Sequence, residues 1–92
     1  MTAGKQRLWG IDEPERQFLL DVTSNMPALR SVVERARPHA EIKGLLVVHA
    51  TVRELDEMYS LVEALMSGAR GQRRRDLLEE LLAGLCTSMD GF

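Results

Sequence analysis

Residues 45–66 read LLVVHATVRELDEMYSLVEALM, and this stretch decides the fold. Its first part, Leu45–Val48, is a continuous apolar run ending in a β-branched pair, which predicts a short buried strand. After Thr51 the spacing changes, because apolar side chains recur every three or four residues, as on one side of a helix. These residues are Val52, Leu55, Met58, Tyr59, Val62, Leu65 and Met66.

Thr51 marks the boundary between the two patterns. Thr-Val-Arg-Glu places a hydroxyl at the N-cap and Glu54 three positions later, which is the spacing of a capping box. A heptad spacing also runs through both parts, and Thr-x-x-Glu occurs by chance inside helices. One long helix from about Pro38 therefore stays open as an alternative to strand followed by helix, which we favour.

The run FLLDVT at residues 18–23 is ambiguous. Its apolar residues alternate as in a strand, but with Asp12 as N-cap and Pro14 in the first turn the same run fits a helix. A short amphipathic helix follows, with its apolar face at Leu29, Val32, Val33 and Ala36, and it ends at Arg37 because the residue preceding a proline avoids the helical conformation. If both apolar runs are strands, this helix joins them as a parallel pair with a right-handed crossover.

The C-terminal third predicts a helical hairpin. Ser67–Gly71 breaks the central helix, with Gly68 as a left-handed terminator. The final helix, GQRRRDLLEELLAGLC, begins at Gly71, and a connection of about five residues predicts antiparallel packing. Its broad apolar stripe consists of Leu77, Leu78, Leu81, Leu82 and Leu85.

Together these patterns predict a single small α+β domain over residues 1–92, dominated by helix, in the order β-α-β-α-α with a C-terminal antiparallel helical hairpin. The alternative is an all-α four-helix bundle in which each proline stands at a helix start. We expect residues 1–8 and 88–92 to be flexible tails and Trp9 to pack at the edge of the domain.

Composition limits the class of protein. The net charge is −2, so the molecule as a whole is not an electrostatic binder of nucleic acid or of anionic membranes. The single cysteine, Cys86, excludes an internal disulfide and suits a reducing compartment. No segment has the length and apolar character of a signal peptide or a spanning helix. We expect a soluble cytoplasmic protein.

The sequence contains no recognisable catalytic or metal-binding pattern. His39, His49 and Cys86 lack the spacing of metal ligands. Cys86 follows leucines of the final helix, which is more typical of a small buried filler than of a nucleophile. The glycines at 68 and 71 follow a helix rather than a strand, so no phosphate-binding loop is indicated. We expect no enzymatic activity, no cofactor and no metal.

Residues 70–75 contain four arginines, Arg70, Arg73, Arg74 and Arg75. Cations in the first turn of a helix oppose its dipole, so local helix stability does not explain them. Guanidinium groups bind phosphates and carboxylates, which predicts a contact with nucleic acid or with an acidic partner. The ordinary alternative is a solvated face with surface ion pairs, such as Arg75 with Glu79 or an arginine with Glu63 of the preceding helix.

The apolar stripes of the predicted hairpin look too wide for one small chain to cover, which favours self-association. We therefore predict a non-enzymatic protein-interaction or regulatory module, homodimeric or bound to another protein through the apolar face of the hairpin, with the arginines at its rim. A nucleic-acid-binding regulator that uses the arginines is the alternative. The predicted contact residues are Met58, Leu65, Leu78, Leu81 and Leu82, with Arg70, Arg73, Arg74 and Arg75.

Overall fold

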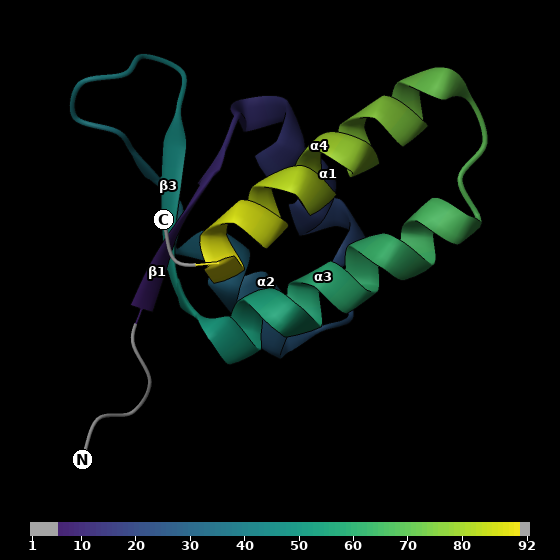
Figure 1. Ribbon diagram of the computed structural model, residues 1–92, viewed down its shortest axis with the longest axis horizontal. Coiled ribbons are helices and arrows are strands. Elements are labelled where there is room, and N and C mark those ends of the chain that lie inside the picture. Colours follow the sequence, from purple (N-terminus) through teal and green to yellow (C-terminus); the bar gives the residue numbers. More distant parts are fainter. Residues whose placement is uncertain (1–5, 91–92) are drawn as a thin grey trace.

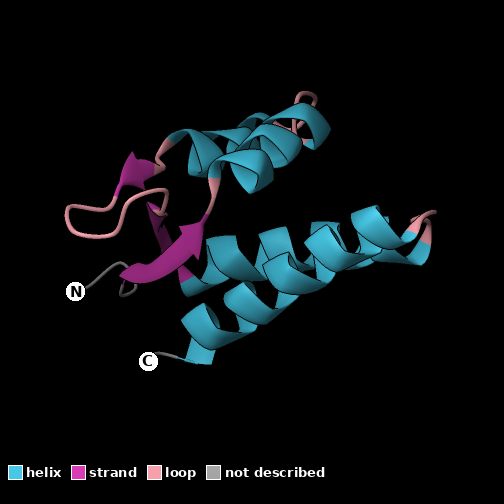
Figure 2. Cartoon of the chain, turned by 90° about the horizontal axis from the view of Figure 1, so that it is seen from above, coloured by secondary structure: helices cyan, strands magenta, loops and turns pink. Residues whose placement is uncertain are grey.

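The computed structural model describes residues 6–90, which form four helices and three strands. The strands make one antiparallel sheet in the order β1–β3–β2, and the helices lie on one side of it (Figure 1, Figure 2). The fold is therefore α+β and rich in helix, as predicted, and the all-α bundle is wrong. In chain order the elements are β1 (Gln6–Ile11), α1 (Glu13–Val22), α2 (Pro27–Glu34), β2 (Arg37–Pro38), β3 (Leu46–Thr51), α3 (Val52–Ser67) and α4 (Gln72–Asp90).

The central stretch divides at Thr51, as the sequence predicts. β3 ends at Thr51, and α3 begins at the next residue. Both hydrogen bonds of the capping box are present: the Glu54 amide donates to the Thr51 hydroxyl at 3.1 Å, and the Thr51 amide donates to the Glu54 carboxylate at 2.9 Å. The alternative of one long helix from Pro38 is therefore wrong.

The predicted strand at residues 18–23 is also wrong, because this run lies in α1 and in the turn after it. A second capping box starts α1: the Glu15 amide donates to Asp12 at 2.8 Å, and the Asp12 amide donates to Glu15 at 2.9 Å. The first strand is instead β1, which pairs antiparallel with β3. The predicted parallel pair with a helical crossover is therefore absent from the described sheet, and the order is β-α-α-β-β-α-α.

Two helix ends differ from the predicted ones. α2 stops at Glu34, three residues before the predicted end at Arg37, and the chain then enters the short strand β2. Gly68 follows α3, but its φ is −105°, so it is not a left-handed terminator. The left-handed glycine of this turn is Gly71, with a φ of 89° immediately before α4. The turn therefore needs a glycine at 71 but tolerates a side chain at 68.

Parts of the predicted tails belong to regular elements. Residues 6–8 lie in β1 and residues 88–90 in α4, whereas residues 1–5, 91 and 92 lie outside the described part of the chain. The Ser88 hydroxyl donates a hydrogen bond of 2.8 Å to the Leu8 carbonyl. This bond joins the last turn of α4 to the edge of β1, so the two ends of the described chain lie side by side (Figure 1).

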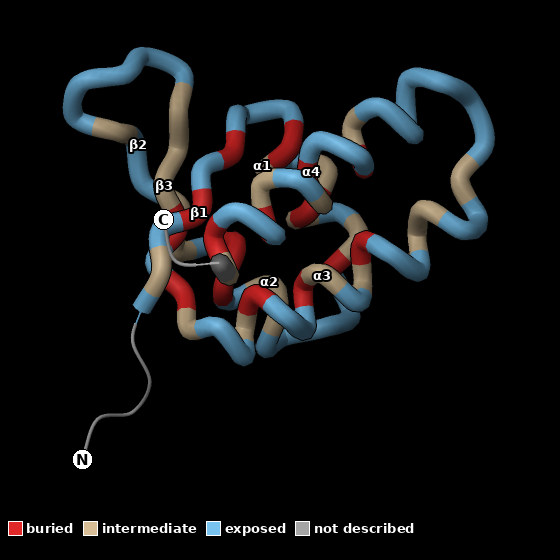
Figure 3. The backbone as a smooth tube through the Cα atoms, in the orientation of Figure 1, coloured by how far each residue is buried: buried red, intermediate tan, exposed pale blue. Residues whose placement is uncertain are grey.

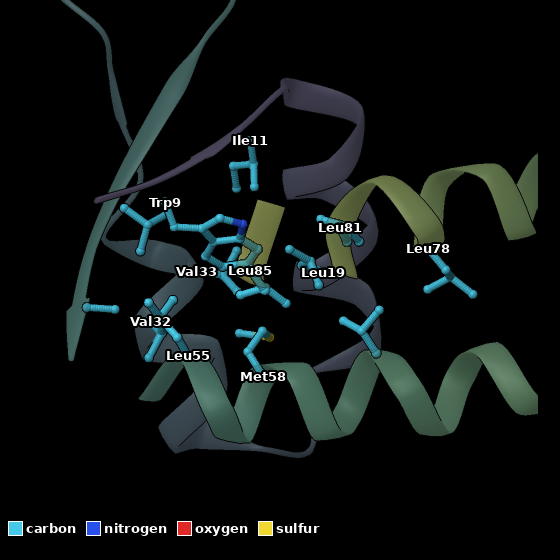
Figure 4. Packing of buried hydrophobic residues seen from close by; sticks show 13 residues of the cluster. Trp9, Ile11, Leu19, Val32, Val33, Leu55, Met58, Leu78, Leu81 and Leu85 are labelled. Carbon is cyan, nitrogen blue, oxygen red and sulfur yellow. The ribbon is translucent and has the colours of Figure 1, made fainter. Parts of the chain in front are cut away.

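One apolar core fills the space between the sheet and the helices (Figure 3, Figure 4). Side chains on the two long strands alternate: Trp9, Val48 and Ala50 point into the core, whereas Leu8 and His49 form a cross-strand pair on the outer face. Trp9 is fully buried, and its indole lies against Gly84 in the C-terminal half of α4. The prediction that it packs at the edge of the domain is therefore wrong.

A bidentate ion pair ties the end of α2 to the start of α3. Both outer nitrogens of Arg35 donate to the Glu54 carboxylate at 2.8 Å, and one of them also donates to the His49 carbonyl at 3.3 Å. Arg35, followed by the backbone amide of Thr51, lowers the pKa of Glu54 from 4.5 to about 2. The pair therefore links α2, β3 and α3 through one carboxylate.

Glu54→Gln is expected to lower the free energy of unfolding by about 1–2 kcal/mol at neutral pH, because the cap and the charge-assisted bonds are weakened together. Because the pKa of Glu54 is lowered on folding, its ionised carboxylate stabilises the folded chain above pH 4.5. This stabilisation is lost as the pH falls toward 2. Urea unfolding at several pH values measures this effect. Between pH 4.5 and 2 the free energy of unfolding should fall less steeply in the variant than in the wild type.

Glu34→Gln is the matched control. Glu34 makes only an exposed ion pair with Arg30 within α2, at 3.2 Å. Loss of this ion pair should lower the free energy of unfolding by about 0–0.5 kcal/mol. Equal effects of the two substitutions at neutral pH, or equal pH slopes for Glu54→Gln and the wild type, would contradict the role given to Glu54.

Candidate functional site

The apolar face of the hairpin is covered within one subunit. Of the predicted apolar contact residues, Met58, Leu78 and Leu81 are at most 1% exposed, and Leu65 and Leu82 are half-buried. Trp9 and other core side chains fill the space against the inner side of α3 and α4 (Figure 4). Three of the five predicted apolar contact residues are therefore enclosed within the subunit, whereas Leu65 and Leu82 keep part of their surface, and association through this face stays a prediction.

The four predicted arginines lie together at the end of the hairpin farthest from the sheet (Figure 1). Arg70 lies in the turn after α3, and the other three lie in the first turn of α4. All four are exposed, and Figure 3 shows this turn as mostly exposed with half-buried segments toward the end of α3. We call these residues, Arg70, Arg73, Arg74 and Arg75, the arginine tip.

The arginine tip has no ion-pair partner among the described side chains. The ion pairs of residues 6–90 join Glu13 with Arg16, Arg30 with Glu34 and Arg35 with Glu54. The predicted pairs of Arg75 with Glu79, and of an arginine with Glu63, are not formed. Asp76, the nearest acid in sequence, instead accepts a hydrogen bond of 2.8 Å from Gln72. The guanidinium groups of the tip are thus available to an external anion.

Arg74 differs from the other three because it is held in place. Its guanidinium carbon lies 5.4 Å from the centre of the Phe18 ring of α1, in a cation–π contact. By helical spacing Arg74 continues the face of Leu78, Leu81 and Leu85 one turn beyond the core. Its guanidinium is therefore held against α1, although the residue as a whole is exposed.

Two shallow hollows adjoin Arg74. The first lies between α3 and the turn and has a volume of about 480 Å³, and the second lies between α1 and α4 and has a volume of about 300 Å³. Arg74 lines both of them. The first is lined in addition by Ala64, Leu65, Gly68, Ala69 and Arg70, and the second by Phe18, Arg73 and Leu77.

The charge of the chain is unevenly distributed. The net charge is −2 and the arginine tip contributes +4, so the rest of the chain carries −6. The N-terminus of α4 adds the positive end of a helix dipole at the same place. Arg73 also borders a groove with acidic residues, among them Asp12, the N-cap of α1, and Glu80 of α4. The tip is thus an electropositive end on an otherwise acidic molecule.

A hollow of about 670 Å³ lies on the outer face of the sheet and is lined by Leu8, Arg37, Val47 and His49 among others. His39 lies at its border, but its Nδ1 accepts the amides of Glu41 and Ile42, each at 3.0 Å. One ring nitrogen of this histidine therefore holds the loop between β2 and β3.

The potential catalytic residues do not converge. Cys86 is exposed on α4, so the prediction that it is a buried filler is wrong. Its thiol lies near Tyr59 of α3 and raises the pKa of that phenol. His49 belongs to the outer face of the sheet, on which Cys86 does not lie. Within residues 6–90 the structure holds no group of three or more acidic, histidine or cysteine side chains placed to bind a metal ion.

No protein-family model matches this chain, and searches of curated proteins and of solved structures return no significant match. Of the helices in residues 6–90, none has both the length and the apolar character needed to cross a bilayer. Function is therefore inferred from the chemistry of the chain's own surface.

Proposed function

We propose that this chain is a non-enzymatic interaction module that binds an acidic segment of another protein through the arginine tip. The observation that carries the proposal is that four exposed arginines within six positions make no ion pair with a described side chain. Carboxylates of a partner would supply the missing counter-charges, and guanidinium groups bind carboxylates with two parallel hydrogen bonds.

Stability of the fold does not account for these charges. Arg73, Arg74 and Arg75 stand in the first turn of α4, where cations interact unfavourably with the helix dipole. Neutral side chains would make the first turn of α4 more stable. A binding role explains why a helix terminus carries charges that oppose its own stability.

An acidic protein segment fits the tip better than a nucleic acid does. The remainder of the chain carries −6, which repels a long polyanion that extends beyond the tip. Among the described residues, Phe18 is the one aromatic side chain that lines the hollows beside Arg74, so the tip has no row of aromatic rings on which successive bases could stack. A short acidic segment contacts the tip alone and avoids most of this repulsion.

Replacing Arg70, Arg73 and Arg75 together with glutamine tests the proposal, since Arg74 keeps its contact with Phe18. The probe is a fluorescent ten-residue peptide of glutamates, titrated at low salt. Each lost charge pair weakens binding modestly, so we expect the triple variant to bind at least about ten-fold more weakly. Fluorescence anisotropy measures the dissociation constant.

The matched control replaces Arg37, Lys43 and Arg53 with glutamine, because these exposed cations lie elsewhere and their loss changes the net charge equally. We expect less than about two-fold weakening in the control. Equal weakening in both triple variants, or no binding by the wild type, would contradict the proposal. Tighter binding to a DNA or RNA oligonucleotide, lost in the tip variant alone, would instead support the nucleic-acid alternative.

The same variants report on stability. The tip variant should unfold at the same urea concentration as the wild type or at a higher one, gaining up to about 1 kcal/mol from the relieved dipole. A loss of stability in the tip variant would show that the arginines serve the fold, which contradicts a binding role.

A further inference from the structure

We infer that the acidic segment recognised by the arginine tip also carries apolar side chains, one on each side of a carboxylate that pairs with Arg74. This inference rests on the proposed function and specifies the partner. It is carried by the two hollows that adjoin Arg74, since each combines an apolar floor with guanidinium groups at its border.

The first hollow, between α3 and the turn, is shaped to receive an apolar side chain. Its floor includes Leu65 and Ala69, both half-buried, and its border carries Arg70 and Arg74. At Gly68 an added Cβ would meet no heavy atom within 4 Å. The space above Gly68 is therefore open, and burying an apolar group there would remove the exposed part of Leu65 from water.

The second hollow lies on the other side of Arg74 and has a similar character. Phe18 of α1 and Leu77 of α4 are half-buried and form its apolar part, with Arg73 and Arg74 at its border. The guanidinium of Arg74 stands over the Phe18 ring, and Arg74 lines both hollows, so one cation is shared by the two.

The order of these features along the surface predicts the order of side chains in the partner. An apolar side chain in the first hollow, a carboxylate on Arg74 and an apolar side chain in the second hollow would occupy all three features together. Interfaces commonly combine arginine with partly buried apolar residues, because packing excludes water from the ion pair and strengthens it. A segment of glutamates alone would leave both hollows unfilled.

The test compares two peptides of equal length and charge. One alternates glutamate with glycine, and the other replaces the glycines that flank the central glutamate with leucine. Binding is measured at about 0.5 M salt, where the Debye length is shorter than at physiological salt and surface charge pairs are weakened. We expect the leucine peptide to bind at least about ten-fold more tightly than the glycine peptide.

Gly68→Met is the blocking variant. Because the φ of Gly68 is −105°, a methionine is tolerated there, and its side chain would occupy the first hollow. We expect this variant to bind the leucine peptide at least about five-fold more weakly and the glycine peptide as the wild type does. Ala28→Met, at an exposed position of α2, is the matched control and should leave both affinities unchanged.

Each outcome separates the inference from the proposed function. If both peptides bind equally and Gly68→Met has no effect, the inference is wrong and the proposed function stands. If neither peptide binds at low salt, the proposed function itself fails. If the wild type self-associates on concentration and Gly68→Met abolishes this, the hollow is filled by a second copy of the chain, which also overturns the inference.

Discussion

Leu81→Asp is expected to lower the free energy of unfolding by about 4 kcal/mol or more, which is enough to unfold many domains of this size. Leu81 is 1% exposed and stands in the middle of α4, on the side that faces the core (Figure 4). A carboxylate at this position would be cut off from water without a cation to pair with. Circular dichroism during urea unfolding measures the loss.

Ala83→Asp is the matched control, because Ala83 is exposed on the same helix two residues later. It should cost less than about 1 kcal/mol. The effect of Leu81→Asp should not depend on protein concentration, because the leucine is enclosed within one subunit. A Leu81→Asp variant as stable as the wild type, or one rescued by raising the protein concentration, would show that Leu81 lies in a surface or an interface.

Trp9→Ala is expected to cost about 3–5 kcal/mol, as is usual when a large buried aromatic side chain is truncated. Trp9 is the largest fully buried side chain and joins β1 to α4, where its indole lies beside Gly84. Its indole nitrogen has no acceptor among the described residues, so the loss is one of packing and not of a hydrogen bond. Thermal unfolding followed by circular dichroism measures the effect.

Leu8→Ala controls for the position in the strand, because Leu8 precedes Trp9 and is 61% exposed on the outer face of the sheet. Its cost should stay within about 0.5 kcal/mol. Similar losses for the two substitutions would mean that β1 does not present alternate residues to the core and to solvent as described.

The starts of α1 and α3 were the most predictable part of the fold. At Thr51 and at Asp12 the cap and the acid three positions later specify hydrogen bonds that form within four residues. Such local signals do not depend on the rest of the chain. At residues 18–23 the alternation of apolar residues suggested a strand, and the capping signal just before them was the better guide.

β1 could not be recognised, because its partners are distant in sequence. Gln6–Ile11 is short and half polar, and it becomes a strand by pairing with β3 about forty residues later. Its placement brings Trp9 into the core, and the indole covers leucines that the sequence had left open to a second subunit. Periodicity shows which side of a helix is apolar, but not which distant residue covers it.

The candidate site was predictable in its charges and not in its shape. The grouping of four arginines is visible in the sequence, whereas the absence of their expected ion pairs depends on side-chain geometry. The hollows on each side of Arg74 combine residues of α1, α3 and α4, and the contact of Arg74 with Phe18 spans more than fifty positions. Only the folded chain brings these groups together.

The most direct test of the arginine tip as the partner-binding surface is an NMR titration of the labelled protein with the leucine-containing acidic peptide. We predict that the largest amide shifts fall on residues 64–77 and on Phe18, with little change on the outer face of the sheet around Leu8 and His49. Shifts centred on that outer face, or shifts spread evenly over the surface, would contradict the account.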